Sequence, residues 1–370
     1  MRKRAVKTIG IECPIIREGD DIISIVIDSV LKEMSEPQFK DFNTANTDVY
    51  DDEGNFVCSH HDINDKDIIG ITESVVARAA GQFITVDDIA EDIKKKFGEN
   101  ATVCLINPIY SRNRFSMILK GIARAAKKVI IIMPEKDEVG NPRGVNKFTG
   151  VNICNYYDEL CMSENCECEI YKGVQDCKMY LKELVCNSID CRLHIKGKTN
   201  YKYSLADICS DKSPDWGVLG TNKSTDERLK LFPSIAECKR VCESVKVKIK
   251  EATGRDVIVC VYGDGCFKDP VGGIYEFADP TTMPYYTDSD IMESTPNEIK
   301  LKSLIDSSAS NAEVRRRIEM QRSQKSNLVG KMSSMGTTPR VIRDLVASLM
   351  DLNSGSGDRC TPVVLVQNYV

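Results

Sequence analysis

Two glycine-bearing segments, each containing an aspartate, are the residues of this sequence best suited to bind phosphate. Residues 262–265 (Tyr-Gly-Asp-Gly) follow the apolar run 257–261, and residues 354–358 (Ser-Gly-Ser-Gly-Asp) precede the apolar run 363–366. In such a turn, glycine lets backbone N–H groups approach a phosphate while the aspartate holds a divalent cation. Neither segment matches the Walker lysine motif or the dinucleotide fingerprint, and ordinary tight turns use the same residues. The spacing alone therefore leaves a phosphate site and a purely structural turn both open.

Six cysteines between residues 161 and 191 are a second group that could carry chemistry, because thiolates are soft ligands that suit zinc and iron–sulfur clusters. They are Cys161, Cys166, Cys168, Cys177, Cys186 and Cys191. Their spacing is irregular and contains no CxxC pair, so dispersed thiols explain it as well as a metal or redox module does. The histidines at 60, 61 and 194 are too isolated to indicate a Ser-His-Asp or Cys-His hydrolase.

Length and composition predict a globular protein of one large or two ordinary domains. The chain has 370 residues, of which 42% are hydrophobic and 28% charged, which excludes a wholly disordered, collagenous or fibrous chain. Its 50 basic and 55 acidic residues leave a formal charge of -5, so neither a nucleic-acid polymer nor a membrane surface is an expected partner.

The sequence also predicts a soluble protein of the cytoplasm. Its opening residues, Met1–Arg4, are not followed by an apolar signal segment, and its longest apolar runs fall far short of the roughly 20 residues that span a membrane. In a long chain of this kind, we expect the 16 cysteines to be reduced thiols rather than a disulfide framework.

Hydrophobic periodicity predicts alternating strands and helices, with a repeated strand–helix–strand unit between residues 102 and 134. Predicted strands cover residues 6–11, 67–71, 103–106, 129–133, 257–261 and 363–367, and predicted helices cover 22–32, 75–80, 86–97, 115–127, 237–252, 312–325 and 340–350. The repeated unit should have parallel strands and a right-handed crossover. Residues 135–215 give no clear elements, because Gly, Asn, Pro and Cys punctuate them. The run Arg315–Arg317 reads as a solvated helix face.

Four stretches occur in order, at residues 11–21, 67–82, 220–267 and 349–364, and together they resemble the coenzyme F-420-0:L-glutamate ligase (F-420 γ-glutamyl ligase) family. Residues 11–21 are similar to its opening loop and Gly-Asp-Asp helix start, and residues 67–82 to the strand and helix near GTP. Residues 220–233, followed by residues 254–267, look like its metal-binding core, and residues 349–364 are similar to its C-terminal Gly-rich loop and strand. The resemblance implies an α+β or mixed α/β ligase-like core with an inserted βαβ-containing region.

This resemblance implies a site for GTP and for Mg²⁺ or Mn²⁺. Its nucleotide contacts would be Cys13, Pro14, Ile15, Ile16, Thr72, Ser74, Arg78, Ser354, Gly355, Ser356 and Gly357, and its metal ligands Asn222, Asp264 and Asp358. Arg78 and Asp264 would be catalytic, as phosphate-side cation and metal ligand. The chain departs from the family where Asn222 replaces a metal-ligating aspartate and where Asp264 is displaced. Asparagine brings no charge, so the cation would be held more weakly unless Asp264, Asp226 or Asp358 compensates.

The resemblance further implies an enzyme that forms an amide bond. A carboxylate would be activated by the γ-phosphate of GTP, and the amino group of glutamate or another amine would displace the phosphate. Residues 1–100 and 216–370 would form the core, residues 101–215 the cysteine-rich insertion, and residues 279–338 a further polar insertion; the enzyme would be a homodimer. Two alternatives stay open: a catalytically degenerate nucleotide- or acyl-ligand-binding protein of the same fold, and a cysteine-rich metal or redox module. The choice between GTP and ATP is also open.

Overall fold

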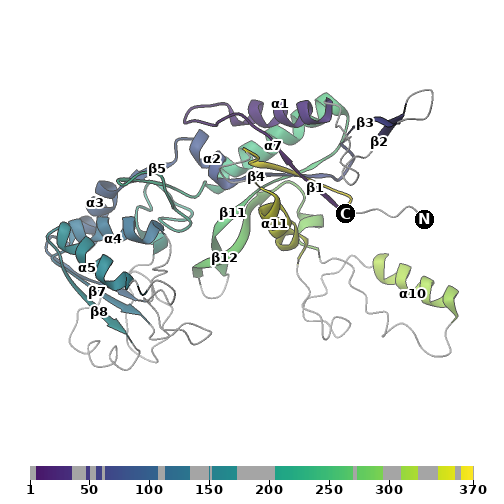
Figure 1. The fold of residues 1–370 in the computed structure, drawn as a ribbon. Coiled ribbons are helices and arrows are strands. Elements are labelled where there is room, and N and C mark those ends of the chain that lie inside the picture. The colour runs from purple at the N-terminus through teal and green to yellow at the C-terminus, as the bar shows by residue number, and fades with distance from the viewer. Residues whose placement is uncertain are drawn as a thin grey trace. The chain divides into compact units, whose positions relative to one another are not determined.

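The computed structural model divides the chain into two compact units (Figure 1). Unit 1 comprises Met1–Ala79, Ile235–Gly263 and Thr281–Val370, and unit 2 comprises Ala80–Ser234 and Asp264–Pro280. The structure describes residues 6–35, 47–50, 56–60, 63–106, 113–133, 150, 152–172, 205–269, 273–294, 310–323, 341–354 and 360–369.

Unit 1 is built on a five-stranded sheet with the order β1-β13-β4-β11-β12. These strands are β1 (Lys7–Ile11), β13 (Val363–Gln367), β4 (Ile68–Thr72), β11 (Ile258–Asp269) and β12 (Gly273–Tyr286). The parts of β11 and β12 that lie within Asp264–Pro280 belong to unit 2. β4 and β11 run parallel, whereas β13 runs antiparallel to both of its neighbours, β1 and β4. A separate antiparallel pair is formed by β2 (Thr47–Tyr50) and β3 (Phe56–His60).

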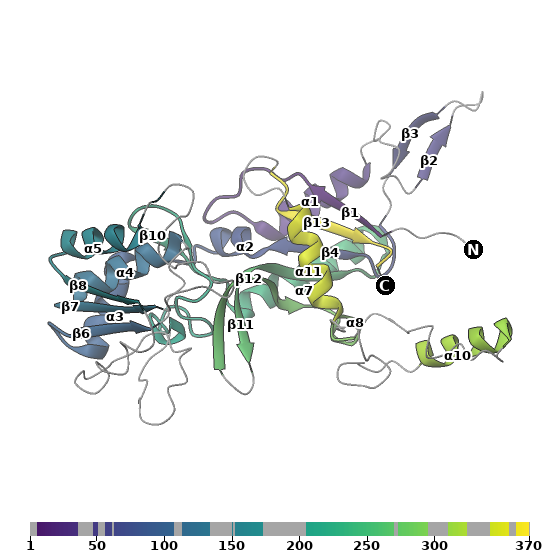
Figure 2. The ribbon, with the colours of Figure 1, turned by 60° about the horizontal axis from the view of Figure 1, so that its bottom comes forward.

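Helices cover both faces of the unit 1 sheet because successive strand residues point to opposite sides. Ile69 and Ile71 of β4 pack with α1 (Ile22–Ser35), α2 (Glu73–Ala79) and α7 (Ile235–Thr253). Ile68 packs with α8 (Ser289–Met292) and α11 (Ile342–Asn353) on the other face, as Figure 2 shows for α11. On that face, a Cβ added at Gly70 would lie 2.2 Å from Met350 Sδ, so glycine is what lets α11 approach the sheet.

Unit 2 contains three parallel strands in the order β6-β7-β8, joined by helices. The chain order is α3 (Val86–Phe97), β6 (Thr102–Ile106), α4 (Asn113–Ala125), β7 (Lys128–Met133), α5 (Ile153–Ser163) and β8 (Glu167–Lys172). A second sheet has the order β5 (Phe83–Thr85), β10 (Arg228–Lys230), β9 (Asn222–Lys223), and a 3₁₀ turn covers Leu205–Asp207. The predicted parallel strand–helix–strand unit is confirmed, and α5 and β8 extend it by one repeat that the cysteine-rich sequence concealed.

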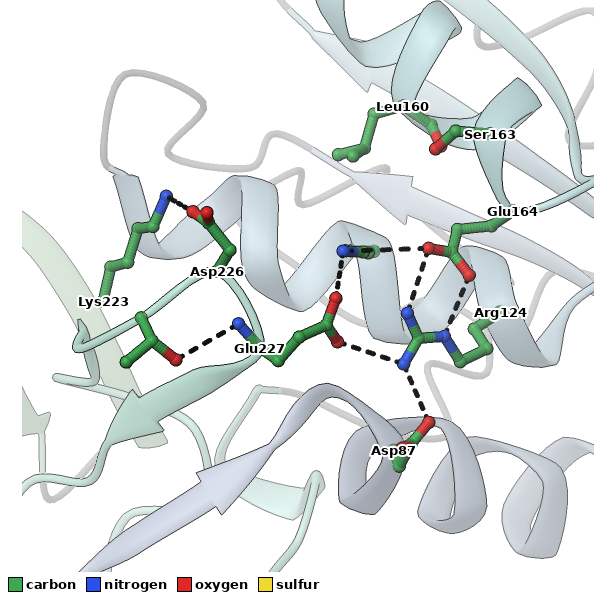
Figure 3. A network of polar contacts seen from close by, with 10 residues as sticks. Asp87, Arg124, Leu160, Ser163, Glu164, Lys223, Asp226 and Glu227 are labelled. Carbon is green, nitrogen blue, oxygen red and sulfur yellow. Dashed lines mark hydrogen bonds and ion pairs between the residues drawn. The ribbon is translucent and has the colours of Figure 1, made fainter.

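A network of charged side chains joins the elements of unit 2 around Arg124 on α4 (Figure 3). Its guanidinium donates to both oxygens of Glu164, at 2.9 and 3.1 Å, to Asp87 at 2.8 Å and to Glu227 at 3.2 Å. Lys120, one turn earlier, also pairs with Glu227. The network therefore links α3, α4, the end of α5 and the segment before β10, and it holds Arg124 in a single orientation.

The mixed α/β fold class predicted from the sequence is confirmed, and all the predicted strands and helices are present. Their ends are shifted by a few residues, except that the strand predicted at 257–261 continues to Asp269. Asp21 caps α1 by accepting from Ile23 N and Ser24 N, as the acidic turn predicted. On α10 (Asn311–Ser323), Arg315 and Arg316 are exposed, in agreement with a solvated face. The division into family core and insertions stays a prediction, because it concerns relatives rather than the compactness of this chain.

One prediction about local structure was wrong. Residues 262–265 are not a turn, because β11 continues through them to Asp269 between its neighbours β4 and β12. Pairing with neighbouring strands favours the extended backbone at these residues. Glycine is needed at position 263 because a larger residue would have no room for its side chain, not because the chain bends there. Among the helices that the structure describes, none has the length and apolar character needed to cross a membrane.

Candidate functional site

The last residues of β1 and β4 and the first residue of β13 meet beside β11 at one end of the unit 1 sheet. Ile11, the last residue of β1, pairs with Val363, the first residue of β13. Val363 also pairs with Ile71 of β4, and Thr72 at the end of β4 pairs with Tyr262 of the parallel strand β11. The segments around residues 12, 72, 262 and 362 therefore lie beside one another, and we refer to this part of unit 1 as the site edge.

Backbone hydrogen bonds connect the loops at the site edge. Cys13 N donates to Cys360 O at 2.8 Å, and Thr72 N donates to Pro362 O at 2.9 Å. A third bond, from Gly19 N to Ala79 O at 2.9 Å, joins the loop after β1 to the end of α2. These bonds place three of the four stretches behind the family resemblance in one region of the molecule.

The predicted contacts from Cys13 to Ile16 differ in their exposure. Cys13 and Ile16 are buried in the core beneath α1, whereas Pro14 and Ile15 are exposed, Ile15 by 67%. Burial raises the pKa of the Cys13 thiol, and the thiol donates to Ile11 O. Cys13 is therefore an anchor for the loop rather than a reactive thiolate, and Pro14 and Ile15 provide the surface that a ligand could reach.

Thr72 and Ser74 are half-buried at the junction of β4 and α2, as a contact with a ligand requires. Between them, Glu73 is only 4% exposed and lies against β11. A Cβ added at Gly263 would come within 2.2 Å of Glu73 Cγ, so only glycine leaves room for this side chain. Sequence reasoning missed Glu73, although an acidic residue directly after an apolar strand is a signal that could have found it.

Tyr262 is a second residue of the site edge that sequence reasoning treated only as part of a turn. Its side chain is fully buried against Met350, and its hydroxyl has no hydrogen-bond partner among the described residues. Burial raises the pKa of Tyr262, while the nearby Ser354 side chain lowers it without reaching hydrogen-bond geometry. Burying a phenol oxygen without a hydrogen-bond partner costs free energy, so the hydroxyl of Tyr262 is an unusual feature of the site edge.

The other predicted nucleotide contacts are Arg78 and the 354–357 loop. Arg78 is exposed on the last turn of α2 and forms no ion pair with the described part of the chain, so its guanidinium is available to an anion. Ser354 ends α11, where its N–H donates to Met350 O at 2.8 Å and its hydroxyl donates to Asp351 O at 3.1 Å. Gly355, Ser356 and Gly357 lie outside the described residues.

The described part of the structure does not show the three predicted metal ligands grouped in one place. Asn222 lies on β9 of unit 2, Asp264 lies on β11 two residues past Tyr262, and Asp358 is outside the described residues. Asp226, the proposed compensating charge, forms an exposed ion pair with Lys223 at 2.6 Å. Within the part of the chain that the structure describes, no group of three or more His, Cys, Asp or Glu side chains could hold a metal ion.

A layered α/β unit with polar residues grouped at the ends of its strands is the arrangement of enzymes that bind small ligands at a sheet edge. Comparison with protein families agrees with this class, since residues 10–368 match the family model described as F420-0:Gamma-glutamyl ligase. Because the match covers nearly the whole chain, the protein belongs to the F420-0:gamma-glutamyl ligase family. The search of curated proteins found no match.

Proposed function

We propose that this protein is a nucleotide-dependent ligase that activates a carboxylate by phosphoryl transfer from GTP and couples it to glutamate or another amine. The observation that supports the proposal is the site edge, where the ends of β1 and β4 and the start of β13 lie beside one another and Thr72 pairs with Tyr262 of β11. Membership of the ligase family supports the reaction type. The proposal includes a cytoplasmic homodimer with small-molecule substrates.

The reaction requires negatively charged groups to be held together. A carboxylate oxygen attacks the γ-phosphorus, the bond to the β-phosphate breaks, and the amine then displaces phosphate from the acyl phosphate. In this proposal, the Arg78 guanidinium binds the phosphates, and the hydroxyls of Thr72 and Ser74 orient them. Mg²⁺ or Mn²⁺, when bound, neutralises part of this charge.

Hard divalent cations such as Mg²⁺ and Mn²⁺ take oxygen ligands from carboxylates and amides. We propose Asp264 and Asp358 as carboxylate ligands and Asn222 as a neutral ligand or substrate contact, in accordance with the family resemblance. Glu73 is added from the structure, because its buried side chain crosses the backbone of Gly263, next to Asp264. Its carboxylate supplies charge that Asn222 does not.

The exposed residues Pro14 and Ile15 give the site an apolar surface. Ile15 is 67% exposed and belongs to the loop that Cys13 N fixes to Cys360 O. A flat aromatic group gains free energy by covering such a surface. We therefore assign this surface to a ring of the nucleotide or of the acid to be activated.

The test is a coupling assay with the full chain. Protein is incubated with GTP, Mg²⁺ or Mn²⁺, glutamate and the deazaflavin acid of the family reaction, and both released phosphate and the mass of the amide product are measured. Phosphate release that depends on the acid, on glutamate and on the metal is expected, and parallel assays with ATP decide the nucleotide. Nucleotide binding without any product would instead indicate the degenerate binding protein, and absence of nucleotide binding would refute the proposal.

A further inference from the structure

Three cysteines lie together where α5 ends and β8 begins in unit 2. Cys161, in the last turn of α5, is fully buried, Cys166 is 3% exposed, and Cys168 on β8 is half-buried. Cys166 N donates to Cys161 O at 2.9 Å, which folds the chain back onto the last turn of the helix. Cys161 and Cys166 belong to the hydrophobic core of unit 2, and Cys168 packs against the same core. The thiols therefore occupy one side of the sheet.

Within this group, Cys161 and Cys168 form a pair. The side chains of Cys161 and Cys168 interact, and this interaction raises the pKa of Cys161, as burial also does, and lowers the pKa of Cys168. The pKa of Cys166 is raised to about 11, mainly by burial. A half-buried thiol with a lowered pKa beside a second thiol is the arrangement in which oxidation to a disulfide is favoured.

We propose that Cys161 and Cys168 are an oxidation site, at which a hydroperoxide converts the two thiols into a reversible disulfide. The proposal concerns unit 2 alone and does not depend on the ligase activity. Cys168 is the thiol that reacts first, because it is the more exposed of the pair, and Cys161 is the resolving thiol. Cys166 remains reduced.

The chemistry balances without any cofactor. The Cys168 sulfur attacks one peroxide oxygen, an S–O bond forms, the O–O bond breaks, and the leaving oxygen departs as water or alcohol with the proton of the thiol. The Cys161 sulfur then attacks the Cys168 sulfur, an S–S bond forms, and the hydroxyl leaves as water with the second proton. Two thiols have lost two electrons, and the peroxide has gained them. A small dithiol reverses the step.

The disulfide would join the last turn of α5 to β8, which is an edge strand of the order β6-β7-β8. The residues between the two cysteines form a short closed loop, so the bond removes conformations from the unfolded chain. We expect oxidation to raise the melting temperature of unit 2 by about 5 °C. Trp216, the single tryptophan of the chain, is buried in unit 2 and reports this transition by fluorescence.

The sequence permits a direct test, because Glu164 and Glu167 separate the three cysteines. The full chain is treated with hydrogen peroxide, its free thiols are alkylated, and it is cleaved after glutamate for mass spectrometry. Cleavage yields the peptides Leu-Cys-Met-Ser-Glu, Asn-Cys-Glu and Cys-Glu, which contain Cys161, Cys166 and Cys168 respectively. The expected product is the first peptide linked to the third, and its loss after treatment with dithiothreitol.

Two cysteine variants and the oxidation of Met162 serve as controls for this experiment. Cys166→Ser should form the same product and show the same temperature shift, whereas Cys168→Ser should show neither. Met162, which is 65% exposed, measures the oxidant dose through its sulfoxide. The proposal is overturned if Met162 is oxidised while Cys161 and Cys168 stay unlinked, or if the linked peptides contain Cys166.

Discussion

Replacing Gly263 with alanine tests whether Glu73 lies across β11 at the site edge. The new Cβ would stand 2.2 Å from Glu73 Cγ and 3.1 Å from Glu73 Cβ, whereas ordinary contacts begin near 3.4 Å. The side chain of Glu73 must therefore move by more than an ångström inside a packed region. Gly263 lies in an extended strand, so the backbone itself accepts alanine and the side-chain clash accounts for the effect.

The magnitude follows from overpacking. We expect Gly263→Ala to lower the free energy of unfolding by about 1–3 kcal/mol. In a Glu73→Ala background Cγ is absent, and the closest contact left is the one at 3.1 Å. The same glycine substitution should then cost less than about 1 kcal/mol, which gives a coupling energy of about 1–2 kcal/mol between the two positions.

The assay is urea unfolding of the four proteins of this cycle, followed by far-ultraviolet circular dichroism. Circular dichroism is required because Trp216 lies in unit 2 and does not report on the site edge. Gly70→Ala is the matched control, since its Cβ would meet Met350 on the other face of the same sheet. It should destabilise the protein equally with and without Glu73.

The result that would refute this reasoning is an equal cost of Gly263→Ala in both backgrounds. Additivity within about 0.3 kcal/mol would mean that the Glu73 side chain does not occupy the space beside Gly263. Glu73 would then not belong to the site, and the proposed ligand set would lose the carboxylate of Glu73.

Three further predictions address the site and unit 2. Tyr262→Phe should raise the free energy of unfolding by up to about 1 kcal/mol, because it removes a buried hydroxyl without a described partner. Arg78→Ala should weaken GTP-dependent coupling by about 10²-fold through loss of a phosphate contact, whereas Arg255→Ala, an exposed arginine ahead of β11, should leave it unchanged. Pairing with Lys120 and then Arg124 holds the pKa of Glu227 below its usual range, so this carboxylate stabilises unit 2 above about pH 4.5 and loses that effect as the pH falls through its folded pKa. Arg124→Met should therefore flatten the loss of stability on acidification.

Each of these predictions has a measurement that can contradict it. A loss of more than 1 kcal/mol in Tyr262→Phe would show that its hydroxyl has a partner in the folded protein; Tyr285→Phe, which breaks a 2.6 Å bond to Glu243, is the comparison expected to lose stability. Equal rates for the two arginine variants in the phosphate-release assay would remove Arg78 from the site. Identical acid titrations of Trp216 fluorescence for wild type and Arg124→Met would exclude a contribution of the network.

Local patterns in the sequence determined most of the fold. The apolar periodicity of α3 and α4 and the buried runs of β7 and β13 identify their elements without any tertiary information, because burial of one face imposes a period on the chain. Cap residues such as Asp21 and the glycine after α7 marked where helices begin and end. The order of four short motifs was enough to identify the family.

Only the tertiary structure decided which of these motifs meet. The pairing of Thr72 with Tyr262 joins residues far apart in sequence, and it arises from hydrogen bonds between strands that no local pattern encodes. The same pairing keeps residues 262–265 extended, where their composition alone favours a turn. Glu73 acquired its place at the site edge in this way too: its type is visible in the sequence, but its burial against Gly263 depends on two parallel strands lying side by side.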